Sequence, residues 1–147
     1  MLEGVHTYQV DQKARFFAPV EWRGDLREGG WMTRGLEPCL VIFPLKKWTA
    51  ILKRLNRLPF TDPKVRAVQR YLSIGEKVKL DTQNRLMIPP TLRAYAGIAV
   101  DKDKENDLFL VGLGDRAEIW SKAVWDEYDR TQLSSQAVIE QAASLVF

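Results

Sequence analysis

The chain repeats itself, and this repeat constrains the possible folds more than any other feature of the sequence. Residues 8–23 read YQVDQKARFFAPVEWR and residues 78–93 read VKLDTQNRLMIPPTLR, so Asp, Arg, Pro and Arg recur at the same spacing. A second match joins residues 42–48 to residues 119–125 in the same order along the chain. The displacement grows from 70 to 77 residues between the two matches, as an ordinary loop insertion would cause. The sequence therefore predicts two structurally equivalent halves.

Both copies predict the same succession of strand, turn, strand and helix. Strands are expected at residues 5–10, 15–18, 39–43, 77–80, 85–88, 108–113 and 116–120. Helices are expected to begin at Pro19, Pro44, Asp62, Pro89 or Pro90, and Ser121. Surface loops are expected at Gly24, at Gly29 and Gly30, and at the charged run of residues 101–107.

These elements predict an α+β fold with a mostly β core. At 147 residues the chain is long enough to bury a core but too short for several large domains. We expect residues 1–74 to form the first repeat with a basic helical extension and residues 75–130 to form the second. Residues 131–147 are expected to be a terminal helix or a disordered tail. The halves are expected to intertwine, and neither is expected to be stable alone.

The sequence contains no recognisable catalytic or metal-binding motif and no cluster of His or Cys. One cysteine, Cys39, and one histidine, His6, cannot complete a standard structural zinc site. The chain has no glycine-rich phosphate loop, no HExxH sequence and no serine-centred elbow. We therefore expect a protein that is not an enzyme and uses no cofactor or metal. Cys39 lies in an apolar run and is expected to be a buried structural thiol.

No segment of the sequence predicts a membrane span. The longest apolar runs, such as residues 39–43, are far shorter than the roughly 20 residues that cross a bilayer. Residues 1–4 lack the basic and apolar regions of a signal peptide. We expect a soluble cytoplasmic protein without a membrane partner.

Charge is distributed unevenly along the chain. The net charge of +3 divides into 17 Lys and Arg against 9 Asp and Glu in residues 1–98, and 5 against 10 in residues 99–147. The basic part favours an anionic partner, and the acidic remainder fits a role in solubility or assembly. Residues 46–70 carry eight cations and one acid, which fits either an anion-binding surface or the solvated side of amphipathic helices.

The two D-x-x-x-R elements are the main candidates for a binding site. Asp11 and Asp81, each first in a tight turn, are expected to accept backbone hydrogen bonds and so to orient the turn. Arg15 and Arg85 carry planar forks of donors that suit phosphate oxygens, or O6 and N7 of guanine in a major groove. The alternative is that each arginine only pairs with its aspartate to hold the turn. Repetition beside a basic surface favours a binding role for the arginines and a structural role for the aspartates.

Further cations lie in or near the two predicted hairpins. They are Lys13, Lys77, Lys79, Arg23 and Arg93. We expect them to position a phosphate backbone without reading its sequence, although each fits a solvated surface equally well. Trp48 and Trp125 occupy equivalent places in the repeat and are expected to pack in the core or at a subunit contact.

Several segments together resemble the MraZ family of bacterial transcriptional regulators. They are the opening MLEG, the two D-x-x-x-R elements followed by Pro, CLVIFPLKKW at residues 39–48, and VRAVQR at residues 65–70. The likeness extends to about residue 129. It implies two tandem swapped-hairpin, AbrB-like half-domains that form a split β-barrel with flanking helices. It also implies ring-like homo-oligomers that bind short direct repeats in the promoter of the division and cell-wall gene cluster, usually as a repressor.

The resemblance assigns the two Asp–Arg pairs as the family's motif residues, with one departure. The family pattern usually has glycine just before the motif arginine, where this chain has Ala14 and Asn84. Asparagine tolerates a left-handed backbone conformation, whereas alanine does so poorly. We therefore expect the first hairpin to turn differently from the second.

The sequence favours a sequence-specific regulator that binds double-stranded DNA in the cytoplasm, at the nucleoid, through identical hairpins on an oligomer. Tethered copies raise the effective concentration for every contact after the first. The rival hypothesis is a non-enzymatic assembly protein whose hairpins mediate subunit contacts and whose basic face meets an acidic protein. A steep salt dependence of duplex binding would distinguish the regulator from this rival.

Overall fold

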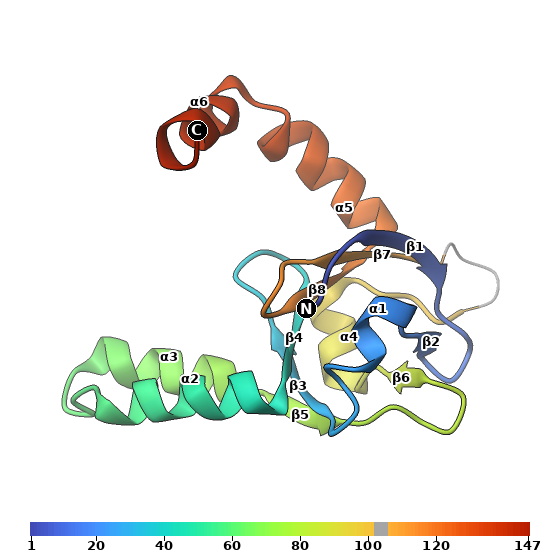
Figure 1. The fold of residues 1–147 in the computed structure, drawn as a ribbon, viewed down its shortest axis with the longest axis horizontal. Helices are drawn as coiled ribbons and strands as arrows, with labels where there is room; N and C mark the ends of the chain where they lie inside the picture. The colour runs from blue at the N-terminus through green and yellow to red at the C-terminus, as the bar shows by residue number, and fades with distance from the viewer. Residues whose placement is uncertain (102–105) are drawn as a thin grey trace.

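The protein is built on a six-stranded antiparallel sheet and a separate two-stranded ribbon (Figure 1). The structure is a computed structural model that describes residues 1–101 and 106–147. The strands are β1 (Val5–Gln9), β2 (Arg15–Phe17), β3 (Gly30–Arg34), β4 (Leu40–Pro44), β5 (Gly75–Val78), β6 (Arg85–Met87), β7 (Asp107–Gly112) and β8 (Ala117–Ser121).

Strands from the two halves of the chain pair with each other in both sheets. The large sheet has the order β1-β7-β8-β4-β3-β5, so each edge strand pairs with a strand of the other half. The ribbon likewise joins β2 to β6. The large sheet remains open at β1 and β5, and the described strands form no closed barrel. The mixed α+β class expected from the sequence is confirmed.

Some helices pack within the β core and others extend from it in two directions (Figure 1). They are α1 (Val20–Arg23), α2 (Leu45–Arg57), α3 (Pro63–Ser73), α4 (Pro90–Ala96), α5 (Lys122–Tyr128), the π-helix η1 (Asp129–Leu133) and α6 (Gln136–Leu145). We call the α2–α3 pair the helical arm; it extends from one side of the sheet, and α5 and α6 leave on another. Within the described residues, no helix combines the length and the apolar composition needed to cross a bilayer.

The main core joins the large sheet to the ribbon and to helices α1 and α4. Phe16 and Leu86, one from each copy of the repeat, lie opposite each other across the ribbon and are each 1% exposed. Trp22 of α1 is fully buried, and its Nε1 donates a hydrogen bond to the backbone oxygen of Glu3 at 3.0 Å. Cys39 is also fully buried, and this burial raises the pKa of its thiol, as expected for a structural cysteine.

A second, smaller cluster attaches the helical arm to the sheet. Trp48 of α2 stacks on Trp31 of β3, with ring centroids 5.0 Å apart. The Trp31 Nε1 donates to the backbone oxygen of Leu72, and the Thr33 hydroxyl donates to that of Ile74, both near the end of α3. Trp48 is therefore a packing residue, as expected, and β3 anchors both helices of the arm.

Strand β3 and the start of β5 differ from the sequence prediction. Gly29 and Gly30 predict a loop, yet both are buried and Gly30 begins β3. A Cβ at Gly30 would lie 2.8 Å from the backbone oxygen of Phe43, so glycine is what allows β3 to approach β4. Strand β5 begins at Gly75, two residues earlier than expected, because Gly75 pairs with Thr33 of β3.

The C-terminal segment is helical rather than a disordered tail. Helix α6 begins after Ser135, whose hydroxyl accepts a hydrogen bond from the Val138 N–H. Helix α5 packs on the sheet through Trp125, which stacks on Phe109 at a centroid distance of 4.4 Å. Of the loop expected at residues 101–107, residues 102–105 lie outside the described residues, and Asp107 already belongs to β7.

Candidate functional site

The two D-x-x-x-R elements meet in the ribbon formed by β2 and β6. These strands run antiparallel, with Arg15 opposite Met87 and Phe17 opposite Arg85. Opposed residues of a ribbon share one face, and so do residues two positions apart on a strand. All four side chains therefore lie on one face, which we call the ribbon face. The residues between them lie on the other face and belong to the core.

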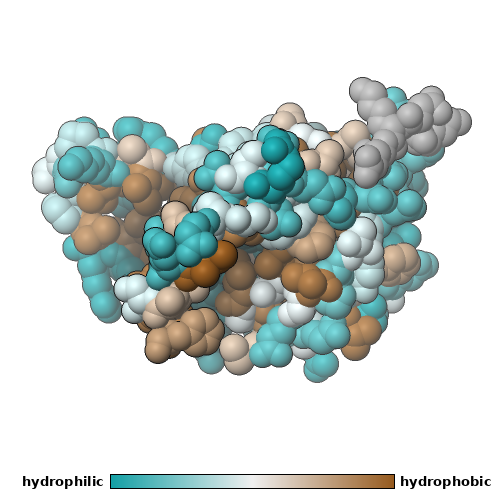
Figure 2. Space-filling view, turned by 90° about the horizontal axis from the view of Figure 1, so that it is seen from above, coloured by the Kyte–Doolittle hydropathy of each residue, from teal (hydrophilic) through white to brown (hydrophobic). Residues whose placement is uncertain are grey.

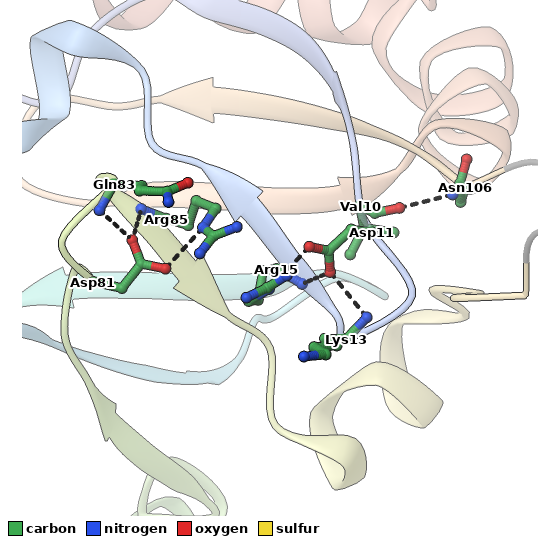
Figure 3. Close-up of polar contacts among 8 residues, drawn as sticks. All are labelled: Val10, Asp11, Lys13, Arg15, Asp81, Gln83, Arg85 and Asn106. Carbon is green, nitrogen blue, oxygen red and sulfur yellow. Dashed lines mark hydrogen bonds and ion pairs between the residues drawn. The ribbon is translucent and has the colours of Figure 1, made fainter.

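Each aspartate closes its own turn with three hydrogen bonds (Figure 3). Asp11 Oδ1 accepts the backbone N–H groups of Lys13 and Arg15 at 2.9 and 2.8 Å, and Oδ2 accepts Arg15 Nε at 2.9 Å. Asp81 Oδ1 accepts the N–H groups of Gln83 and Arg85 at 2.8 and 2.9 Å, and Oδ2 accepts Arg85 Nε at 2.8 Å. These bonds hold the turns and set the direction in which each guanidinium points.

The two turns share one backbone conformation, so the expectation that the first hairpin turns differently is wrong. Ala14 and Asn84 are both left-handed, with φ of 62° and 61°. Their N–H groups donate to the backbone oxygens of Asp11 and Asp81, each at 3.0 Å. Alanine in this conformation costs roughly 1–2 kcal/mol. The turn bonds and the burial of the Ala14 methyl, 1% exposed, offset that cost.

Hydrogen bonds favour the ionised form of both motif aspartates. Burial disfavours a charge on Asp11, but the bonds from Arg15 and Lys13 outweigh burial and lower the pKa of Asp11. At Asp81 the backbone N–H of Arg85 is the main cause of a lowered pKa, and the bonds from Gln83 and the Arg85 guanidinium add to it. The turn geometry therefore depends on two carboxylates that stay charged at neutral pH.

The turns are expected to lose stability only in acid. Both carboxyls have a folded-state pKa below the ordinary 3.8, so their stabilising effect is complete above that value and is lost as pH falls through the folded-state values. Urea unfolding between about pH 6 and about pH 2 should show the free energy of unfolding falling below about pH 4. The Asp11→Asn/Asp81→Asn double variant should show a smaller fall. An equal acid dependence in the two proteins would contradict this account.

Each motif arginine is bound through the Nε edge of its guanidinium by the aspartate of the same turn. Within the described part of the chain, the aspartate Oδ2 on Nε is the only hydrogen-bond partner of either guanidinium. The Arg15 and Arg85 side chains are 29% and 20% exposed. A guanidinium fixed through Nε still has two terminal nitrogens that can donate to a planar pair of acceptors.

Sequence reasoning missed two members of the ribbon face. Phe17 and Met87 are 52% and 55% exposed, beside the two arginines. The period of two along a strand was the available signal, because it places Phe17 on the same face as Arg15 and Met87 on the same face as Arg85. The ribbon face is therefore amphipathic, with one large apolar side chain opposite each of the two fixed arginines.

The other predicted cations contribute less directly. Lys13 is exposed within the first turn, and Lys79 is exposed in the segment before the second. Arg23 on α1 is half-buried, and its Nε donates to the backbone oxygen of Ala18 at 3.1 Å. Arg93 on α4 has a buried Nε without a partner among the described residues. The structure thus unites the two motif arginines on one ribbon and places these four cations on flanking segments.

Asn106 braces the first turn and was not a candidate from the sequence. Its side-chain amide donates to the backbone oxygen of Val10 at 2.7 Å (Figure 3). Its own backbone oxygen accepts the Val10 N–H at 3.1 Å. The two residues are 96 positions apart, so local sequence carries no signal for this contact.

The described residues offer no cluster of metal ligands. No group of three or more His, Cys, Asp and Glu side chains among them is placed to hold a metal ion. A hollow of about 740 Å³ lies between the α1–β3 loop and the start of α2 and is open to solvent. Two of its acids are already paired, Asp115 with Lys47 and Asp25 with the N-terminal amine, each at 3.1 Å. The ribbon face is therefore the best-defined candidate site.

Comparisons with known proteins agree on one family. A family model described as MraZ protein, and likened in its description to antitoxins, matches residues 1–71 and 74–146. A transcriptional regulator MraZ of Acetivibrio thermocellus is 35% identical over 147 residues and 99% of both chains. One of Desulfitobacterium hafniense is 37% identical over 147 residues, 99% of this chain and 97% of that protein. One of Clostridium tetani is 32% identical over 146 residues and 99% of both chains.

Proposed function

The chain belongs to the MraZ family, and from this premise we propose that it is a sequence-specific, DNA-binding transcriptional repressor. The names of its relatives support a role in regulating transcription. The proposed target is a set of short direct repeats in the promoter of the division and cell-wall gene cluster. A ring-like homo-oligomer binds them in the cytoplasm, at the nucleoid, without enzymatic activity.

One observation carries this proposal: the ribbon face presents two fixed arginines. A two-stranded antiparallel ribbon is one of the elements that the major groove of B-DNA admits. With Nε held by aspartate, the terminal nitrogens of Arg15 and Arg85 are left to donate to guanine O6 and N7. Phe17 and Met87 add apolar surface of the kind that contacts thymine methyl groups. The ribbon face thus has the shape and chemistry of a base-reading element.

The flanking cations complete the proposed interface. Lys13, Lys79, Arg23 and Arg93 would contact the phosphate backbone, which fixes the register of the protein but carries no base information. Arg23 would do so through its terminal nitrogens, since its Nε is bound to Ala18. The net positive charge of residues 1–98 supports the same partner.

The proposal includes the organisation of the chain. Residues 1–74 and 75–130 form equivalent swapped-hairpin halves of a split barrel, and residues 131–147 follow as a terminal segment. The pairing of β1 with β7 at one sheet edge and of β5 with β3 at the other supports this equivalence. A ring of such chains presents the ribbon face repeatedly, and direct repeats in DNA match its rotational symmetry.

Footprinting on the upstream region of the protein's own gene tests the proposal. Protection should fall on short direct repeats, and a scrambled duplex of equal length should bind more weakly. The logarithm of the binding constant should fall with the logarithm of salt concentration by roughly 0.9 per phosphate contact. A footprint without repeats would contradict the proposed target. No retention of specific duplex at moderate salt would favour the assembly protein that meets an acidic partner.

A further inference from the structure

A row of exposed cations follows one face of helix α2. The row consists of Lys46, Lys53 and Arg57, all exposed. They are seven and eleven residues apart, so at roughly 100° per residue they lie within about 40° of one another around the helix. They extend over about 16 Å of its length. We call these three residues the cationic row.

The cationic row faces away from the contacts that hold the helical arm in place. Trp48 and Ile51 belong to the cluster that packs α2 against the sheet. They lie roughly half a turn around the helix from the row. Figure 2 shows the arm with hydrophilic side chains along its outer edges and hydrophobic ones between them. The row is therefore presented to solvent and contributes little to packing of the arm.

The cationic row forms no ion pair within the described part of the chain, although Lys46 borders the hollow that Asp25 and Glu28 also line. Helix α2 contains no Asp or Glu, and none of the three cations has an ion pair among the described residues. Lys53 and Arg57 are like charges four residues apart, which repel each other on a helix. Lys46 lies in the first turn, where the helix dipole disfavours a cation. Lys46 and the Lys53–Arg57 pair therefore carry a local electrostatic cost, whereas the position of Arg57 in the last turn is favoured by the helix dipole.

Some other cations of the chain do have acidic partners. Lys47, also in the first turn of α2, is paired with Asp115 at 3.1 Å. The C-terminal cations Arg116, Lys122 and Arg130 are each paired with a neighbouring acid. Like Lys13 and Lys79, which also form no ion pair among the described residues, the row leaves its charge available to a partner outside the chain.

We propose that the cationic row binds the phosphate backbone of duplex DNA beyond the segment held by the ribbon face. This inference rests on the proposed function. In Figure 1 the arm and the turns of the two hairpins leave the β core on opposite sides, so the row and the ribbon face would contact different segments of DNA. One DNA strand rises about 3.4 Å per phosphate, so about 16 Å of helix faces several phosphates. Lys and Arg side chains at this spacing neutralise phosphates without reading bases.

The other anionic partner of this row would be the acidic part of a second copy. Residues 99–147 carry 10 acids against 5 cations. Three of those acids, Asp115, Asp126 and Glu127, are already paired within the chain. The DNA backbone carries a regular and stronger negative charge, which favours it over the second copy.

A charge-matched pair of triple variants tests the inference. The first is Lys46→Gln/Lys53→Gln/Arg57→Gln, and the control is Arg116→Gln/Lys122→Gln/Arg130→Gln, which removes the same charge from paired sites. On a duplex with long flanks, the first variant should bind roughly tenfold more weakly at low salt, with a salt slope shallower by up to roughly 3. Its preference for direct repeats over a scrambled duplex should be unchanged. On a duplex trimmed to the repeats, it should bind like wild type.

The outcomes separate the inference from the proposed function. If the first variant keeps the wild-type slope on long duplex, or loses affinity equally on trimmed duplex, the inference is wrong and the proposed function stands. If wild type binds no duplex, both fail. If the variant instead changes the oligomer mass in sedimentation while its slope stays unchanged, the row meets a second copy and the inference is wrong. The control should keep the wild-type slope.

Discussion

Replacing Arg15 or Arg85 with alanine is expected to abolish stable binding of the promoter repeats while the chain stays folded and assembled. Each bidentate contact between arginine and guanine contributes about 1–3 kcal/mol of discrimination, or about 5- to 150-fold in affinity. Every copy in an oligomer carries the change, so the losses multiply. The two turns have matching hydrogen bonds, so both variants should behave alike in a gel mobility-shift assay.

Two kinds of control sharpen this test. Arg15→Lys and Arg85→Lys keep the charge but lose the planar fork, so salt-dependent binding should remain while preference for the repeats falls. Arg130→Ala removes an arginine that is also paired with a carboxylate, Glu127 at 2.8 Å, but on the C-terminal helical segment. It should bind like wild type. An Arg15→Ala protein that shifts the repeats normally would show that Arg15 does not read them, and the same holds for Arg85.

A fragment of residues 1–74 is expected not to fold as a monomer. In the full chain β1 pairs with β7, β2 with β6, β3 with β5 and β4 with β8, and all four partners lie in the second half. Without them, the fragment would expose unpaired backbone groups and one side of the main core. Circular dichroism and sedimentation at low concentration should show an unfolded chain.

Adding the missing half should restore the fold. A fragment of residues 75–147 supplies the four absent strand partners, so an equimolar mixture should regain a cooperative unfolding transition. The proposed equivalence of the halves adds that two copies of residues 1–74 can replace each other's partners at high concentration, and sedimentation would detect that dimer. A folded monomer of residues 1–74 would show that the two halves are independent domains.

Local parts of the candidate site were predictable because their contacts lie within five residues. Asp11 and Arg15 bond through a carboxylate, a backbone N–H and a side chain of the same turn, and spacing alone predicts this. The conformation of Ala14 was predicted wrongly, because the bonds of the turn and burial of its methyl outweigh the preference of alanine. Gly30 was predicted wrongly because its close approach to Phe43 is a contact between strands.

By itself, the sequence determined the repeat, the two turns and the chemistry of the motif side chains, since each depends on spacing and residue type. Only the tertiary structure decided that β2 pairs with β6. That pairing brings Arg15 and Arg85, 70 positions apart, to one face and exposes Phe17 and Met87 beside them. The pairing of β2 with β6 is favoured because it buries the residues on the opposite face of the ribbon. It also satisfies backbone hydrogen bonds between strands that are distant in the sequence. Neither condition can be evaluated from a local stretch of sequence.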